Sequence, residues 1–513
     1  MKKNWFYLFA LICSVALFTA CSDDEDTSWQ QIPETEINVG ENATLTMNGV
    51  AVTTGSVQMT VNDATNGVLT LNNVVPGYDN VQVNVVLEKQ ADETFRFTGS
   101  QELATAPDTK DEASATPIMT VTVEGYISLE GEVSVDVTAS GLGLLAGTYA
   151  ADQLALTYGG IAVTGKSASF NIVDAQTATI TLSGADNALL SGLAGASVKN
   201  PGVVPGEAST TLNVTLVPEG TTGYTFAGTD EANGRTLNYT GAIEAGKLTL
   251  DVDVTFADNN LQGTWNLFSS DDPWNMTYPI HAVWNHDPQI SLGEGFNVDL
   301  GFFLNIIIQL PLIGEADNQQ SLNAMIAAVL QNVTFRNDGN LIASYSDAAN
   351  VVAPSWQNSP EGLVQYAVKN DRILVYLDID MIMGSLMAAS TSTKAEGDVD
   401  LEGTLLTTLL GHINEIAPML SEGISLGYNI DEETGMLSVY VDQNGLGAVL
   451  LDIAGELLGN EALMAALSDM MTSNPDFADF APMVEMLLPQ LPAAVAGTTN
   501  LELGLNFNPA AAE

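Results

Sequence analysis

The chain has 513 residues, of which 46% are hydrophobic and 15% are charged. Its 13 basic residues are outnumbered by 63 acidic ones, so the formal net charge at pH 7 is −50. A field of this sign repels nucleic acid and anionic lipid headgroups, which excludes nucleic acid as a partner. The apolar content is sufficient for several hydrophobic cores.

Residues 1–20 have the pattern of a secretory signal peptide. Lys2 and Lys3 form a positive segment, an apolar run extends from Trp5 to Leu17, and small residues precede Cys21. This pattern predicts export and cleavage. The other cysteine, Cys13, lies inside the predicted signal, so no disulfide is expected within the mature chain. No cofactor is expected either, and metal sites built on cysteine are excluded.

The end of this signal, Leu17-Phe-Thr-Ala-Cys21, resembles the lipobox of bacterial lipoproteins. The resemblance implies that Cys21 becomes the first mature residue and carries acyl chains such as palmitate. The alternative is an ordinary cleaved signal that contains a cysteine. Residues 21–34 form an acidic tether, and its start, Ser22 to Asp26, resembles the surface-export signal of Bacteroidetes lipoproteins. The prediction is a lipid-anchored protein of the outer membrane that faces the exterior and has the membrane as a partner through its anchor.

An internal repeat follows at residues 35–141 and 142–258. Four segments of the first copy match four of the second in the same order. The matched pairs are 45–52 with 156–163, 75–87 with 204–216, 95–99 with 224–228, and 131–137 with 246–252. Apolar and polar residues alternate within them, which is typical of strands with one buried and one solvated face.

The repeats resemble the calycin-like β-barrel domains of Bacteroidetes lipoproteins. The C-terminal region, 259–513, opens with Leu261-Gln-Gly-Thr-Trp265, which is similar to the lipocalin opening, whose tryptophan plugs the closed end of a barrel. We therefore expect a mainly β chain: two tandem antiparallel β-barrel or sandwich repeats, then a calycin-like β domain with inserted α-helices. Hairpins are predicted around Gly339, Asn370 and Gly435, and a last strand at 501–507. Helices are predicted at 322–330, 406–420, 446–457 and in two later segments.

Four aromatic residues are the candidate ligand-binding set of this region: Trp274, Tyr278, Trp284 and Trp356. Aromatic faces beside Asp and Asn suit sugar rings, which stack on apolar faces and form hydrogen bonds at their edges. The alternative is that they belong to the core, which is the interpretation we favour for Trp265. The set predicts a non-catalytic ligand-binding or adhesion module that takes a glycan.

Two further functions stay open. The apolar, Met-rich helices at 446–491 could enclose an apolar ligand, which would make the protein a carrier, although packing as a second core is favoured. Carboxylate pairs at i and i+2, above all Asp378 with Asp380, could serve a hydrolase or a weak metal site. The same spacing on a strand also describes a solvated face, as for Asp251 and Asp253. No catalytic residue is assigned, and His281 and His286 are expected to be surface or loop histidines.

Overall fold

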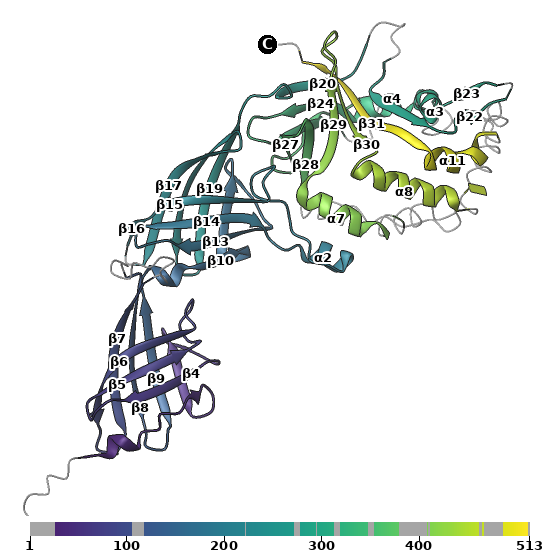
Figure 1. Cartoon of the computed structure of the whole chain (residues 1–513). Coiled ribbons are helices and arrows are strands. Elements are labelled where there is room, and N and C mark those ends of the chain that lie inside the picture. The colour runs from purple at the N-terminus through teal and green to yellow at the C-terminus, as the bar shows by residue number, and fades with distance from the viewer. Residues whose placement is uncertain are drawn as a thin grey trace, which may run out of the picture. The chain divides into compact units, whose positions relative to one another are not determined.

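The computed structural model describes residues 26–104, 117–220, 222–270, 277–293, 295–311, 319–346, 353–378, 408, 411–460, 464–465 and 486–510. Cys21, Trp274 and Asp380 lie outside these residues. The fold is mainly β with few helices and strongly curled sheets, which confirms the predicted fold class (Figure 1). The chain divides into two compact units: residues 1–147 with two short segments of the second repeat, 171–178 and 218–222, and the remainder of the chain. The domain boundaries proposed from the sequence stay predictions.

The first repeat is one curled, nine-stranded sheet. Its strand order is β1-β4-β5-β6-β7-β8-β9-β2-β3. The strands are β1 Ile37–Asn38, β2 Ala43–Met47, β3 Val50–Ala51, β4 Ser56–Val61, β5 Asn66–Asn72, β6 Asn80–Lys89, β7 Phe95–Leu103, β8 Met119–Ile127 and β9 Val133–Ser140. An isolated bridge between Val39 and Ala43 brings β1 beside β2, so the two ends of the meander meet.

Side-chain alternation explains this curl. In β6 every second residue is buried, and Val81, Val83, Val85 and Leu87 point into one core while their neighbours face solvent. Burying each such side chain stabilises the fold by about 1.5–3 kcal/mol, so the sheet curls until its apolar face is enclosed. The core cluster of this repeat contains apolar residues from every strand except β3.

The second repeat divides its ten described strands between two sheets. One has the order β10-β13-β14-β15 and the other β12-β11-β19-β18-β17-β16. The strands are β10 Gly147–Ala150, β11 Leu154–Tyr158, β12 Ile161–Ala162, β13 Lys166–Ile172, β14 Thr177–Gly184, β15 Ser209–Thr215, β16 Val217–Glu219, β17 Gly223–Ala232, β18 Arg235–Glu244 and β19 Lys247–Phe256. A short helix, α2 (Ala188–Ala194), interrupts them.

Both repeats contain one parallel strand pair, which the expected antiparallel meander does not include. Leu45 of β2 lies opposite Val135 of β9, and Leu156 of β11 lies opposite Leu250 of β19. In the first repeat the reason is directional: β1 is antiparallel to β4, and five antiparallel steps lead from β4 to β9. A strand that continues in the direction of β1 must therefore run parallel to β9. The equivalent pairing in both copies supports the internal repeat.

An aromatic ring covers a glycine at matching places in the two repeats. Phe97 lies opposite Gly125, and Phe226 lies opposite Gly241. A Cβ atom added at Gly125 would lie 2.6 Å from the Phe97 ring, and one at Gly241 would lie 2.5 Å from the Phe226 ring. Because glycine has no side chain, each ring can lie directly over the strand at that position.

The C-terminal region forms a ten-stranded sheet around β31 (Thr498–Pro509). This strand pairs with β20 and β21 on one side and with β30 on the other, so it joins the two halves of the sheet. The path is β26-β25-β24-β20-β31-β30-β29-β28-β27. Its strands are β20 Gly263–Leu267, β21 Ile280–His286, β24 Leu330–Phe335, β25 Leu341–Tyr345, β26 Gln357–Asn358, β27 Val364–Lys369, β28 Arg372–Leu377, β29 Ile424–Ile430 and β30 Leu437–Asp442. A bridge between Asn340 and Gln365 links its two ends.

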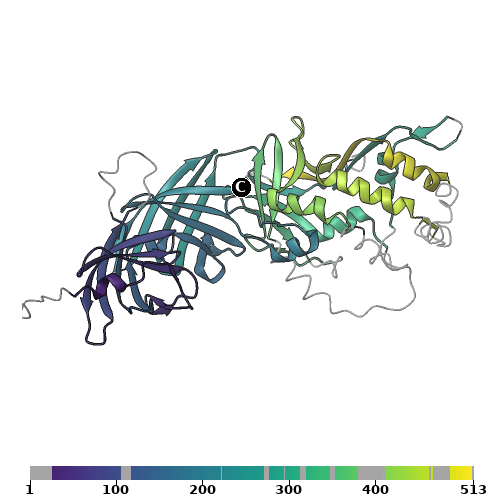
Figure 2. The same cartoon turned by 60° about the horizontal axis from the view of Figure 1, so that its bottom comes forward.

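Helices cover part of this sheet. They are α3 Leu300–Ile307, α4 Leu322–Val329, α7 Ile413–Glu422, α8 Leu446–Gly459 and α11 Leu491–Ala496, and a small hairpin pairs β22 (Ile290–Ser291) with β23 (Asn297–Val298). Figure 2 shows α8 and α11 side by side, and residues of α3, α8 and α11 share one core. Among the described residues no helix is long and apolar enough to cross a membrane.

We predict that Gly125→Ala and Gly241→Ala each lower the free energy of unfolding by about 1–3 kcal/mol, because the new methyl group overpacks against the ring of Phe97 or Phe226 and against a backbone carbonyl of the neighbouring strand. Urea denaturation of the purified protein measures this. The control is Gly455→Ala in α8, where an added Cβ meets no atom within 4 Å. That change should raise stability by up to about 1 kcal/mol. Equal effects at all three sites would contradict the packing argument.

Candidate functional site

The structure gives the predicted aromatic residues different surroundings. Trp284, in β21, is half-buried: its Nε1 donates to Thr498 Oγ1 at 2.9 Å, and its ring packs on the core that α3, α8 and α11 share. The Tyr278 carbonyl accepts a hydrogen bond from Asn506 Nδ2 at 2.9 Å. Trp356 is 37% exposed beside β26. As ligand-binding residues, these three and Trp274 stay predictions.

Trp265 is a core residue, as expected. It is 8% exposed, and its Nε1 donates to the Leu261 carbonyl at 2.8 Å.

His286 is buried, so its expected place on the surface is wrong. It is 3% exposed, its Nδ1 lies 2.8 Å from the Pro288 carbonyl oxygen, and its Nε2 lies 2.9 Å from the backbone nitrogen of Leu300. A carbonyl only accepts and an amide N–H only donates, so the ring is the neutral tautomer with its proton on Nδ1. Through Nε2 it satisfies one of the free N–H groups at the start of α3, and this role leaves neither nitrogen for a metal.

His281 belongs to a polar cluster on the face of the sheet opposite to the one where Trp284 packs. It stacks on Tyr440 with ring centroids 5.3 Å apart, and its Nε2 lies 2.9 Å from Glu502 Oε2. Gly504 lies between the two rings in the strand register, because both His281 and Tyr440 pair with it. In the next row, Asp442 lies opposite Glu502 and forms a two-contact ion pair with Arg372, whose Nε also donates to Ser425. No group of three or more ligating side chains suited to a metal occurs within the described ranges.

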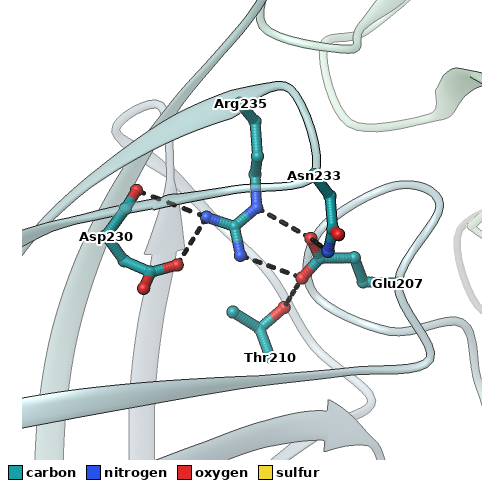
Figure 3. Close-up of polar contacts among 5 residues, drawn as sticks. All are labelled: Glu207, Thr210, Asp230, Asn233 and Arg235. Carbon is teal, nitrogen blue, oxygen red and sulfur yellow. Dashed lines mark hydrogen bonds and ion pairs between the residues drawn. The ribbon is translucent and has the colours of Figure 1, made fainter.

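A buried ion-pair network in the second repeat is the most enclosed set of charges (Figure 3). The Arg235 side chain is 2% exposed, and its guanidinium donates from Nε and Nη2 to the two oxygens of Glu207, each at 2.9 Å. Its Nη1 donates to Asp230 Oδ2 at 2.8 Å. Thr210 and Asn233 also donate to Glu207. Every charged group thus has a partner, which buried charges require.

Neighbouring groups keep these residues charged. Burial raises the pKa of Glu207, but hydrogen bonds from Arg235, Asn233 and Thr210 lower it by more, so that the pKa lies below its usual value. Burial lowers the pKa of Arg235, and its carboxylate partners raise it above its usual value. Glu207 and Arg235 therefore hold fixed charges and do not exchange protons near neutral pH.

The position of the network explains its role. Glu207 follows Pro205 and Gly206, and a Cβ added at Gly339 would lie 3.2 Å from Pro205 Cγ. Gly339 belongs to the turn between β24 and β25. Tyr158 of the second repeat donates to the Asp338 carbonyl of the same turn at 2.5 Å. Arg235 thus fixes the loop with which the second repeat packs on the C-terminal region. Sequence analysis missed it, although arginine is rare here: there are four among 513 residues.

Asp378 lines a cavity of about 30 Å³ together with Lys166, Tyr376 and Asn200. The Lys166 ammonium donates to the carbonyls of Pro201 and Gly202 at 2.9 and 3.1 Å. A cavity of this size has room for a water molecule and is far smaller than the 300–1,000 Å³ typical of ligand sites. The hydrolase hypothesis also needs Asp380, and the carrier hypothesis needs several methionines of 466–485; both lie outside the described residues.

A larger groove, of about 390 Å³, lies on the first repeat. Three turns border it: the first precedes β2, the second joins β6 to β7, and the third joins β8 to β9. They lie together because β2 and β9 start, and β6 and β8 end, at the same end of the sheet. Its lining consists of Glu41, Asn42, Thr44, Thr94, Tyr126, Ser128, Glu132, Val133 and Ser134. Tyr126 is 46% exposed and is the aromatic residue among them. We call this site the three-turn groove; its volume is in the range of small-ligand sites.

Backbone hydrogen bonds hold its walls in place. Val133 N donates to the Asn42 carbonyl at 2.8 Å, and this hydrogen bond joins the third turn to the first. Glu132 N donates to Ser128 Oγ at 3.1 Å within the third turn. Thr94 donates through N and Oγ1 to Asp92 Oδ1, which shapes the second turn. The hydrogen bonds that Thr94 donates keep the pKa of Asp92 below its usual value. The groove is therefore preformed, and sequence analysis missed it because its residues come from separate turns.

We predict that Arg235→Met lowers the free energy of unfolding by about 3–5 kcal/mol, because Glu207 loses its buried partner. Denaturant unfolding measures the loss. Arg336→Met is the control, since that side chain is 41% exposed and its ion pairs are solvated; its effect should be much smaller. Similar losses in both variants would contradict the role assigned to burial.

The stability lost through Arg235→Met should also depend on pH. Because the folded-state pKa of Glu207 is lowered, its contribution is fully present above its unfolded pKa of about 4.3 and is lost as the pH falls below that value. The difference in stability between wild type and variant should thus be constant at neutral pH and shrink in acid. Unfolding curves at about pH 7, 5 and 3 test this, and a difference that grows in acid would contradict it.

No family model matches the chain, and neither does any curated protein. One solved structure that matches is the crystal structure of a "putative outer membrane protein" from Bacteroides fragilis. It is 14% identical to this chain, and the match covers 45% of this chain and 91% of the other, with a TM-score of 0.16. At that TM-score the likeness supports no conclusion about function.

Proposed function

We propose that the protein is a lipoprotein anchored to the outer membrane through acylated Cys21, with its folded body outside the cell, and that it binds a glycan without catalysing a reaction. The observation that carries the binding part is the three-turn groove. The anchor rests on the sequence of residues 1–26, which resembles a lipobox followed by a surface-export signal.

The groove offers the contacts that a sugar ring needs. Tyr126 presents an exposed aromatic face on which the apolar face of a pyranose can stack. Hydroxyls of Thr44, Ser128 and Ser134 and the amide of Asn42 can donate and accept at the ring edge. The carboxylates of Glu41 and Glu132 can accept hydrogen bonds from sugar hydroxyls. The proposed glycan site thus lies on the first repeat, whereas the aromatic residues singled out in the sequence lie in the C-terminal region.

We predict that Tyr126→Ala weakens glycan binding by about tenfold, since it removes the stacking face. A glycan array with the full-length protein identifies a ligand, and isothermal titration measures its Kd. Tyr126→Phe keeps the ring and should bind nearly as well as wild type. An array without any bound glycan, or a Tyr126→Ala variant with unchanged affinity, would contradict the proposal.

We also predict that Cys21→Ser releases the protein from the membrane fraction, because serine lacks the thiol that carries the proposed lipid anchor. Mass spectrometry of the wild-type N-terminal peptide should show acyl chains on Cys21. Protease treatment of intact cells tests the orientation: an outward-facing body is degraded. A wild-type chain without acylation would contradict the anchor and leave the binding proposal standing.

A further inference from the structure

The charged side chains that line the three-turn groove all have one sign. Glu41 and Glu132 line it, and no lysine or arginine does so in the described part of the chain. Glu41 accepts a hydrogen bond from the neutral amide of Asn38 at 3.3 Å, which leaves its charge uncompensated. Asp92, in the second turn, has a lowered pKa and is ionised at neutral pH. A ligand in this groove therefore meets at least two carboxylates.

The nearest basic side chains are already paired. Arg96 lies opposite Tyr126 in the ladder of β7 and β8, and its guanidinium donates to Glu124 Oε1 at 2.6 Å. The hydrogen bond that Arg96 donates to Glu124 is also the main reason that the pKa of Arg96 lies above its usual value. Lys89 pairs with Asp26 at 2.7 Å. Neither cation is available to offset the two glutamates.

Tyr126 adds to the preference for positive charge. The face of a phenol ring attracts a cation. Each carboxylate that lines the groove adds a Coulomb attraction, which is weaker at an exposed site than in a buried one. The ring and the carboxylates thus favour a cation at the same place where the hydroxyls favour a sugar.

From this juxtaposition we propose that the three-turn groove selects saccharides that carry free amino groups over neutral and anionic ones. The inference rests on the proposed glycan binding and names its ligand class. A protonated amine on the sugar forms ion pairs with Glu41 and Glu132, while its ring stacks on Tyr126. The acidic excess of the whole chain favours the approach of such a ligand and does not by itself produce selectivity.

The test compares three probes with the full-length protein by isothermal titration: a tetramer of β-1,4-linked glucosamine, its fully N-acetylated form, and cellotetraose. The titrations are done at about pH 5.5, where the amines of the glucosamine tetramer are protonated. We expect the glucosamine tetramer to bind about tenfold more tightly than the two neutral tetramers at low salt. This advantage should fall as NaCl rises to about 0.5 M, because exposed charges are screened.

Variants separate the groove from the general acidity of the surface. Glu132→Gln and Glu41→Gln should each remove about half of the advantage on a logarithmic scale. Glu102→Gln is the matched control: Glu102 lies on the exposed face of β7, about 26 Å along the strand from Thr94. This variant removes the same charge from the same sheet but far from the groove, so it should leave the advantage of the glucosamine tetramer unchanged.

The outcomes are distinct. Equal, Tyr126-dependent binding of all three probes would overturn the amine selectivity and leave glycan binding intact. An advantage that all three Glu→Gln variants reduce equally would show attraction by the overall charge, and would also overturn it. If no probe binds in a Tyr126-dependent way while an array glycan does, the amine class is wrong. If nothing binds at all, the proposed function fails as well.

Discussion

The separation of apolar and polar side chains across each strand is the constraint on which this structure depends. The mature chain is expected to lack a disulfide, so its stability must come from buried apolar area. Strands such as β6, β9 and β19 place every second residue in a core. The acids then have only the outer face to occupy, and Asp251 and Asp253 lie exposed there in β19. The strongly negative surface is thus a consequence of the burial pattern.

The few arginines form ion pairs with acidic side chains that lie close to one another or to a core. Each of the four forms an ion pair: Arg96 with Glu124, Arg235 with Glu207 and Asp230, Arg336 with Asp338 and Glu361, and Arg372 with Asp442. The exposed pairs contribute little to stability, whereas loss of the buried partner at Arg235 would leave two carboxylates close together. The three-turn groove differs because its glutamates have no such partner among the described residues.

Much of the fold could be predicted from local pattern. The period-2 alternation predicted the strands of both repeats, and the turns at Gly339, Asn370 and Gly435 predicted three hairpins that the structure contains. Helices at 322–330 and 446–457 correspond to α4 and α8. Helix α3 was missed: it is only eight residues long, and the side chain that accepts from its first N–H, His286, is contributed by β21.

The functional sites were harder to predict, because each joins residues that are distant in the sequence. Arg235 meets Glu207 from a different turn, and Glu41 and Glu132 meet only after β2 pairs with β9. Parallel closure was itself unexpected, since the direction of β2 depends on the whole meander. The tryptophans attracted attention by composition alone, and composition does not distinguish a ring that packs on helices, as Trp284 does, from one that faces a ligand.

The central place of β31 has a consequence for how the protein is made. Both β20 and β30 need it as a neighbour, yet it lies more than 200 residues after β20 in the sequence. A chain that emerges from its N-terminus can complete the first repeat once β9 is available, whereas the C-terminal sheet must wait for its last strand. Until then its two halves expose unpaired edges, which invite pairing with other chains. The C-terminal region therefore needs protection longest while the chain is being made.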